Sequence, residues 1–354
     1  SAITSNTTAL NGGGIYVQDG VMLLISSTLA GNAGGNGGGI YANSATTSTV
    51  ENSTFFDNRA GDGGGIYASG LLTLTNTTLA YNVGGGAGTG AGLYNDGELH
   101  YRNTIIANSS EGSDCLDGGT IATSVTNLVE DNSCSATFSG DPRLGALGDY
   151  GGSTWTLPLL PGSPAIDAGN AGACLATDQR GVTRTAATCD IGAYESQGFT
   201  LLKGGGDNQR TPVDAPFAQP LTLTLSAGTW EGKQEPVAGG LVTFAGPLSG
   251  AGVTPITATA TVTTGGAAAI TVTANSTGGA FAVRVTALGA SAPLTYSLEN
   301  VIPATTTTTV TATPISTTFG AMVTITAVVT ATSGTPTGWV TFTVDGGAPL
   351  AQPL

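Results

Sequence analysis

The stretch that decides the fold is GGGIY at 37–41. It recurs unchanged at 12–16 and 63–67, and a diverged copy, GAGLY, occurs at 90–94. Successive copies begin 25 to 27 residues apart. A loop that binds a ligand needs one such motif, whereas several copies at near-constant spacing indicate a repeating architecture.

Short apolar segments separate these motifs and align with one another. They read LLISSTLAGN (23–32), TVENSTFFDN (49–58), LTLTNTTLAYN (72–82) and LHYRNTIIANS (99–109). The alignment gives two apolar columns: Leu24, Val50, Leu74, Tyr101 and Leu29, Phe55, Leu79, Ile106. A period near 25 without a helical stripe predicts a parallel β-helix, in which each repeat is one rung of about three strands.

Rungs of a β-helix stack about 4.8 Å apart, so equivalent residues lie above one another. The glycines are expected to allow sharp bends and positive φ. The aliphatic members Ile15, Ile40, Ile66 and Leu93 are expected to point inward. The next residues, Tyr16, Tyr41, Tyr67 and Tyr94, then point outward as a structural aromatic file, with a sugar-binding stripe as the alternative. Two polar columns are expected to hydrogen-bond from amide to amide: Ser26, Asn52, Asn76, Asn103 and Asn32, Asn58, Asn82.

The repeats are followed by two long segments, DPRLGALGDYGGSTWTLPLLPGSPAIDAGN (141–170) and CLATDQRGVTRTAATCDIGAYE (174–195). With GGGIY and the STF..N pattern, they resemble bacterial surface proteins that carry right-handed parallel β-helix repeats and a closing segment. The resemblance implies rungs over 1–140 and a C-terminal cap over 141–198. It also implies an extracellular role that is adhesive or structural.

Residues 199–302 resemble a bacterial Ig-like domain. Six or seven short alternating strands are predicted, including LTLTL, LVTFA, ITATATVT, AITVTA, FAVRVTAL and LTYSL. Residues 303–309 are interpreted as a linker, and 303–354 as the linker with an incomplete second Ig-like domain of about four strands. The predicted fold class is therefore all-β: a right-handed parallel β-helix with a disulfide-stapled cap, followed by Ig-like β-sandwich domains.

The chain has four cysteines, Cys115, Cys134, Cys174 and Cys189, which allow three pairings. The nearest-neighbour pairs, Cys115–Cys134 and Cys174–Cys189, are favoured. An even count without CxxC spacing favours an oxidising, extracellular compartment over zinc binding.

Composition excludes some partners. Charged residues make up 9% of the chain, the net charge is −14, and Lys and Arg together number nine. Such a chain offers no basic stripe for nucleic acid. It has no long apolar run that would span a membrane, and a signal peptide is expected to have been removed before this sequence begins.

An enzymatic function is one possibility, because right-handed β-helices include polysaccharide lyases and hydrolases. The rungs offer the acids Glu51, Asp57, Asp62, Asp96 and Glu98, the cations Arg59 and Arg102, and one histidine, His100. Glycoside hydrolysis needs two carboxylates facing one bond, and no second acid shares the column of Asp57. We therefore expect no enzymatic activity, no catalytic residue and no cofactor.

Two further clusters carry charge. The acids of EGSDCLD (111–117) could bind Ca²⁺, but a solvated loop is favoured.

In the cap, the acids Asp141, Asp149, Asp167, Asp178 and Asp190 alternate with Arg143, Arg180 and Arg184. The expectation is a set of acid–arginine pairs that hold an irregular segment together.

Glycosylation is a further possibility. Asn6, Asn52, Asn76, Asn108 and Asn275 head N-x-S/T sequons. The first four fall on or near the asparagine columns, where a buried amide explains them, so Asn275 is the preferred N-glycan candidate. Thr305, Thr306, Thr307, Thr308 and Thr309 are candidates for O-glycans.

Two functional hypotheses remain. The first is an extracellular structural or adhesive surface protein that forms a filament or sheath. A first rung without a polar cap and an incomplete second sandwich predict head-to-tail contacts between copies. The second is a carbohydrate-binding or polysaccharide-depolymerising β-helix displayed on an Ig-like stalk, with surface glycans as partners.

Overall fold

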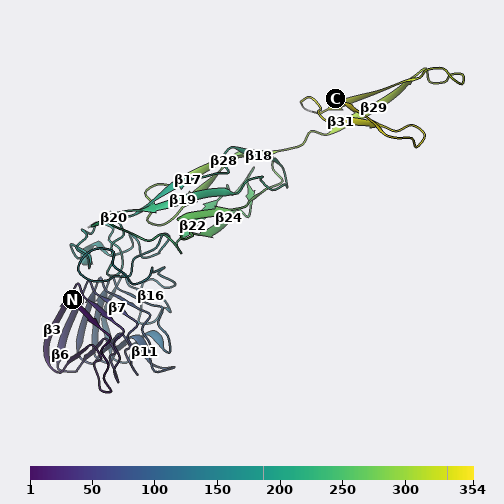
Figure 1. Ribbon diagram of the computed structural model, residues 1–354. Coiled ribbons are helices and arrows are strands. Elements are labelled where there is room, and N and C mark those ends of the chain that lie inside the picture. The colour runs from purple at the N-terminus through teal and green to yellow at the C-terminus, as the bar shows by residue number, and fades with distance from the viewer. Residues whose placement is uncertain (186, 333) are drawn as a thin grey trace.

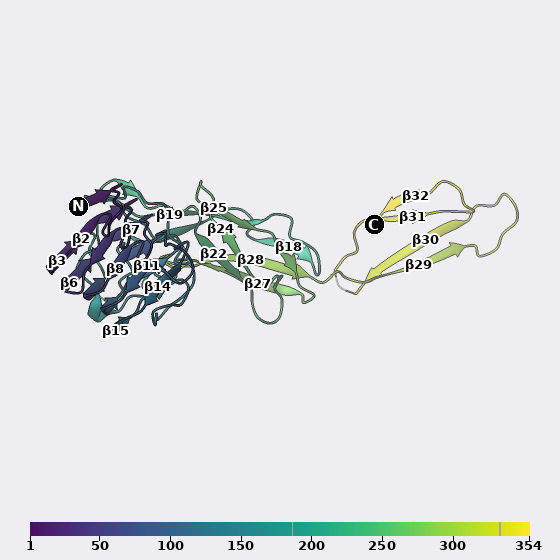
Figure 2. The ribbon, with the colours of Figure 1, turned by 90° about the horizontal axis from the view of Figure 1, so that it is seen from below.

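The computed structural model describes residues 1–185, 187–332 and 334–354. In this part of the chain every extended element is a β-strand and there is no α-helix; one helical turn, η1 (Ala171–Ala173), is of the 3-10 type. Figures 1 and 2 show a β-helix, then a β-sandwich, then two hairpins along an elongated molecule. The predicted all-β class and the parallel β-helix are confirmed.

Three parallel sheets form the β-helix, with one strand of each sheet in every full rung. The first sheet contains β1 (Ala2–Thr4), β4 (Thr28–Ala30), β7 (Thr54–Phe56), β10 (Thr78–Ala80), β13 (Ile105–Ala107) and β16 (Leu128–Val129). The second contains β2 (Ile15–Val17), β5 (Ile40–Ala42), β8 (Ile66–Ala68), β11 (Gly90–Asn95) and β14 (Ser113–Asp117). The third contains β3 (Gly20–Ile25), β6 (Thr46–Glu51), β9 (Leu71–Thr75), β12 (Glu98–Arg102) and β15 (Thr120–Val125).

The three glycines of each GGGIY motif serve two different needs. The first has positive φ, as at Gly37 (65°) and Gly63 (61°), and turns the chain into the second sheet. The other two are required by close stacking. A Cβ on Gly38 or Gly39 would lie 2.5 Å from the carbonyl oxygen of a glycine in the next rung, closer than atoms can approach.

The inward and outward assignments of the Ile–Tyr pair are confirmed. Ile40 pairs in register with Ile15 and Ile66, and Ile40, Ile66 and Leu93 are fully buried. The four tyrosines stack outside with ring centroids 4.9 to 5.3 Å apart and planes within 10°. Both apolar columns lie in the same core.

One asparagine column behaves as predicted. The Nδ2 of Asn32 donates to the Oδ1 of Asn58 at 2.9 Å, and Asn58 donates to Asn82 at 3.0 Å. Asn6 extends the column to the first rung. The amides of Asn32, Asn58 and Asn82 are buried, so the column supplies partners for polar groups that would otherwise be unsatisfied inside the coil.

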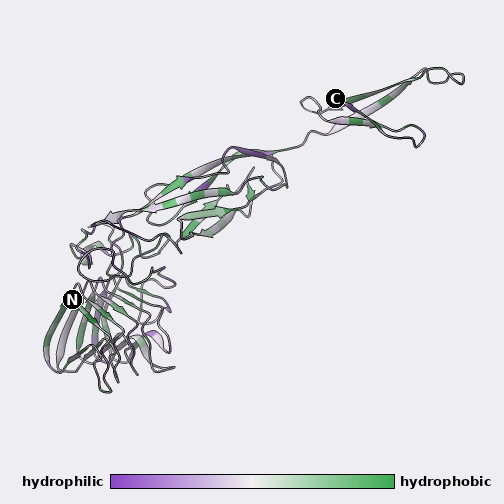
Figure 3. Cartoon of the chain, viewed as in Figure 1, coloured by the Kyte–Doolittle hydropathy of each residue, from purple (hydrophilic) through white to green (hydrophobic). Residues whose placement is uncertain are grey.

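The β-sandwich follows at Phe199. One sheet contains β17 (Phe199–Lys203), β19 (Leu221–Ala227) and β25 (Ala267–Ile270). The other contains β18 (Gln209–Pro212), β28 (Leu294–Val301), β27 (Gly279–Thr286), β22 (Leu241–Ala245) and β24 (Thr257–Thr261). Short pairs flank them: β20 (Thr229–Trp230) with β21 (Lys233–Gln234), and β23 (Val253–Thr254) with β26 (Thr273–Ala274). Figure 3 shows hydrophobic segments on both sheets, and their inward residues form a separate core.

The strands of the sandwich differ from those predicted from the sequence in two respects. AITVTA, expected as one strand, is split between β25 and β26, which belong to different sheets. The strands β17 and β18 were not predicted; Gly204, Gly205 and Gly206 between them obscured the pattern.

The last part forms two hairpins, β29 (Thr306–Thr313) with β30 (Thr324–Ala331) and β31 (Trp339–Phe342) with β32 (Leu350–Pro353). All four predicted strands are present. The prediction of a linker through Thr309 was wrong, because Thr306–Thr309 pair with Ala331–Val328 inside β29. Alternating threonines suit a β-strand as well as they suit a linker.

The inward–outward assignment predicts unequal costs for neighbouring substitutions. Ile40→Asp places an unpaired charge in a closed apolar column and is expected to lower the free energy of unfolding by more than about 3 kcal/mol. Tyr41→Ser removes only an outward stacking partner and is expected to cost about 1 kcal/mol. Urea denaturation of both variants measures the difference. Equal midpoints would contradict the assignment.

Candidate functional site

Residues 141–198, here called the clasp, lie along the side of the β-helix rather than over its end. Thr154 lies beside Ser26 in the first rungs, and Asn170 lies beside Asn103 three rungs later. The prediction of an end cap was therefore wrong for this segment. Figure 1 shows the sandwich leaving the β-helix on the side of β7 and β16, and the clasp forms the junction.

The second predicted asparagine column anchors the clasp. Asn52, Asn76 and Asn103 have φ of 45° to 47°, which is unusual for residues other than glycine. Their Nδ2 groups donate to backbone oxygens of the clasp: Thr177 at 2.8 Å, Asp190 at 3.3 Å and Asn170 at 3.2 Å. The described hydrogen bonds of this column do not include the expected amide-to-amide contacts. The amides donate to carbonyl oxygens of the clasp instead.

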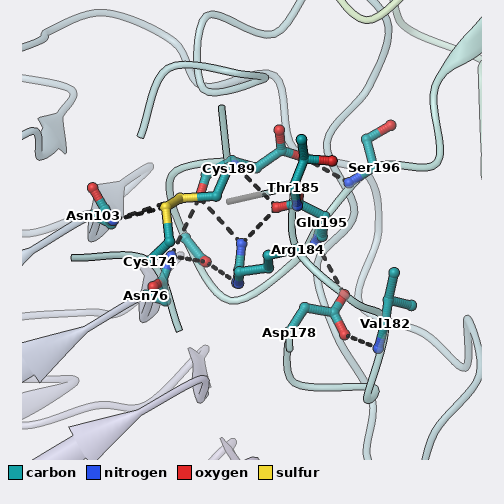
Figure 4. A network of polar contacts seen from close by, with 12 residues as sticks. Asn76, Asn103, Cys174, Asp178, Val182, Arg184, Thr185, Cys189, Glu195 and Ser196 are labelled. Carbon is teal, nitrogen blue, oxygen red and sulfur yellow. Dashed lines mark hydrogen bonds and ion pairs between the residues drawn. A yellow bond between two sulfur atoms is a disulfide. The ribbon is translucent and has the colours of Figure 1, made fainter. Parts of the chain in front are cut away.

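Two arginines, Arg184 and Arg180, hold the clasp internally, and Figure 4 shows the contacts around Arg184. Arg184 donates to the Glu195 carboxylate at 2.8 Å, to the carbonyls of Asp190 and Gly192, and to Asn52 at 3.3 Å. The guanidinium of Arg180 lies 2.9 Å from Asp178. The expected acid–arginine pairing is confirmed for these two arginines.

The acidic partners differ in part from those expected. Glu195 and Glu235 were not predicted; Glu235 lies in the sandwich, 3.7 Å from Arg180. Arg180 also covers the ring of Tyr194, with its Cζ 3.5 Å from the ring centroid. Only the folded chain brings these groups together.

The network is closed to solvent, which determines what it can do chemically. Burial raises the pKa of the Asp190, Glu195 and Glu235 carboxyls and lowers the pKa of Arg184. Perturbed carboxyls in a cleft would suggest catalysis. Here the side chains of Arg180, Arg184 and Asp178 have no exposed surface, so no substrate reaches them and the network is structural.

Both predicted disulfides are confirmed. Cys174–Cys189 lies within the clasp, and its sulfurs are within 3.9 Å of the Asn103 amide. Cys115–Cys134 joins β14 to the segment after β16. That segment folds over the last rung, where the Tyr101 hydroxyl donates to the Cys134 carbonyl. The disulfide-stapled end cap is thus residues 130–138.

The acidic segment at 111–117 was predicted as a solvated loop, and this was wrong, because Ser113–Asp117 form the paired strand β14. Asp114 is 5% exposed, and burial raises the pKa of its carboxyl to about 6. Asp114 and Asp131 each accept the other's backbone N–H, at 3.1 and 2.9 Å. Within residues 1–185, 187–332 and 334–354, no group of three or more His, Cys, Asp or Glu side chains is placed to hold a metal ion.

The candidate catalytic residues do not converge. Arg59 pairs with Glu111 at 3.3 Å, and His100 pairs with Glu98 at 3.0 Å. Asp96 accepts from the Tyr67 hydroxyl; burial and this carboxylate raise the pKa of Tyr67 to about 12. The outward column of the third sheet separates Glu51 from Arg102 by Thr75. These contacts are local pairs on the surface.

The preferred N-glycan candidate is engaged within the sandwich. The Nδ2 of Asn275 donates to the Gly250 carbonyl at 2.9 Å, and its Oδ1 accepts from Gly252 and Asn300. A glycan on Nδ2 would compete with that contact. Of the remaining sequons, Asn52 and Asn76 are buried as expected, whereas Asn6 is exposed and Asn108 half-buried. Thr305–Thr309 are exposed, and O-glycosylation there stays a prediction.

A groove lies between the clasp and the first sheet. It encloses about 520 Å³ and is lined by small residues of the first rungs, by Phe56 and Asp57, and by Leu147 and 153–155 of the clasp. Trp155, one of the lining residues, is 57% exposed. Sequence reasoning missed Trp155 as a site residue. Trp155 reaches the groove only because the clasp lies along the side of the β-helix, and no sequence pattern predicts that position.

The aromatic file is not the better binding surface. Its rings stack face to face, so most faces are covered by neighbouring tyrosines. An exposed aromatic face is what a sugar ring requires for stacking. Trp155 is more than half exposed, whereas Tyr41 and Tyr67 are each stacked against a tyrosine on both sides.

Comparison with known proteins supports the class of fold. Residues 1–145 match the family model described as "Right handed beta helix region". No curated protein matched the chain. Among the residues that the structure describes, no helix is both long and apolar enough to cross a membrane.

Because the network is closed to solvent, removing one of its arginines is expected to cause a large loss of stability. Arg184→Met leaves Glu195 buried without its partner and is expected to lower the free energy of unfolding by about 3–5 kcal/mol. The control Arg210→Met removes an exposed pair with Glu299 and is expected to cost less than about 1 kcal/mol. Hydrogen exchange should show lost protection in the clasp of the first variant. Similar costs for both variants would contradict a closed structural network.

Proposed function

We propose that this protein is an extracellular structural and adhesive surface protein that binds through the groove side of its β-helix. The main support for this proposal is that the buried charged groups and the accessible groove lie in different places. The buried charges are paired with one another at the clasp, and the accessible groove contains a single carboxylate. This arrangement suits binding and not bond cleavage.

The two disulfides support the proposed extracellular location. Cys134, Cys174 and Cys189 lie in segments without regular secondary structure, and the disulfides tie these segments to β14 or to one another. Disulfides of this kind persist in oxidising compartments and stabilise chain segments with little core of their own. The match to a β-helix family is compatible with a surface role.

The junction between the parts favours display of the β-helix on the sandwich. One apolar cluster joins Ile105 and Leu128 of the first sheet, Leu159 and Ile166 of the clasp, and Phe199 of the sandwich. Lys233 pairs with Asp149 across the same junction at 2.8 Å. The sandwich would therefore hold the groove at a fixed orientation.

The alternative is a depolymerising enzyme. Glycosidases place two carboxyl groups about 5 to 9.5 Å apart across the bond that they cleave. Among the described residues that line the groove, Asp57 is the only one with an ionisable side chain. We therefore favour binding without cleavage. Self-association into a filament stays a prediction that is independent of the groove.

Adhesion of beads that carry the whole chain tests this proposal. We expect such beads to be retained on plates coated with polysaccharides or with whole cells, and albumin-coated beads to be washed away. The same plates should release no reducing ends and no unsaturated sugars. Product release that Asp57→Asn abolishes would show an enzyme, and absence of retention on every surface would contradict an adhesive role.

A further inference from the structure

The groove arises from a change of side-chain size along two columns of the first sheet. Ala30 pairs in register with Phe56 of the next rung, and Gly31 precedes Asp57 in the adjoining column. A Cβ on Gly31 would meet no atom closer than 3.7 Å. The small residues of the first rungs leave an open floor, and Phe56 and Asp57 close one end.

The opposite wall is held rigidly although its side chain is exposed. The Trp155 carbonyl accepts from the buried Gln179 at 3.0 Å and also from Thr28. Thr154 accepts from Gln179 at 2.9 Å and donates to the Ser26 carbonyl at 3.3 Å. Polar contacts thus fix the backbone against the β-helix, while Trp155 remains 57% exposed.

We propose that this groove binds a neutral oligosaccharide, with Trp155 as the stacking platform and Asp57 as an acceptor for sugar hydroxyls. The proposal rests on the adhesive function proposed above and names its ligand class. Its two principal groups come from the clasp and from the rungs, so the site exists only in the assembled fold.

The chemistry of the lining favours this ligand class. The C–H face of a sugar ring packs against an exposed indole by dispersion and electrostatics. Thr4, Ser5 and Ser153 bring hydroxyls to the same groove, and hydroxyls donate and accept as sugar hydroxyls require. The volume falls in the range of roughly 300–1,000 Å³ that small-molecule sites occupy.

Charge selects among sugars. Asp57 and the net charge of −14 repel carboxylated or sulfated glycans, and no Lys, Arg or His of the described chain lines the groove to offset that repulsion. A polyuronate would therefore bind less tightly than an uncharged glycan. A lipid chain would leave the carboxylate and hydroxyls without partners.

Isothermal titration of the full chain with hexasaccharides tests the proposal. The neutral probes are cello-, manno- and chitohexaose, and the acidic probe is hexagalacturonate. We expect at least one neutral probe to bind, with little dependence on salt, and hexagalacturonate to bind more weakly. Trp155→Ala is expected to weaken binding at least tenfold, and Asp57→Asn several-fold; asparagine also tolerates the φ of 51° found at this position.

Trp339→Ala is the matched control, because that indole is 69% exposed but lies in β31. It should bind like the unaltered chain. Equal urea midpoints for Trp155→Ala and the unaltered chain would show that the loss is local to the groove.

Four results would overturn the proposal. Binding that survives Trp155→Ala would place the glycan site elsewhere, and binding of hexagalacturonate alone would reverse the charge argument. No binding of any probe, with beads still retained on cells, would reject the groove while leaving the adhesive function standing. Loss of both binding and retention would count against the two proposals together.

Discussion

The structure depends on how closely successive rungs approach at the GGGIY motif. There the backbone of one rung lies where a side chain would otherwise be, so the second and third glycines have no room for a Cβ. This contact fixes the register between rungs. Once the register is fixed, each residue type stacks on its own kind: isoleucine inside, tyrosine outside, asparagine at the turn.

The same register prepares the β-helix for the clasp. Asn52, Asn76 and Asn103 occur once per rung in the same backbone conformation, so their amides form a regular row of donors along one side. An irregular segment can lie along such a row because its carbonyls find partners at intervals set by the rungs. The clasp then closes over its own charges, and its edge completes the groove at Trp155.

Sequence reasoning succeeded where a feature repeats or is local. The columns at Ile40 and Tyr41 and the Asn32–Asn58–Asn82 ladder follow from period and alternation, and neighbouring cysteines close short loops. It failed where a contact joins segments far apart in the chain without a repeat. The lateral position of 141–198, the partners Glu195 and Glu235, and the role of Trp155 depend on how an irregular segment lies in space, which no periodicity encodes.

The triple glycines are architectural, and hydrogen exchange combined with urea denaturation of Gly65→Ala tests this claim most directly. A Cβ there would lie 2.4 Å from the carbonyl oxygen of Gly92, whereas at Gly265, in a turn of the sandwich, it would meet nothing within 4 Å. We predict that Gly65→Ala costs about 1–3 kcal/mol with lost protection in β8 and β11, and that Gly265→Ala is close to neutral. Full stability and unchanged protection in Gly65→Ala would contradict a fold built on close stacking of the rungs.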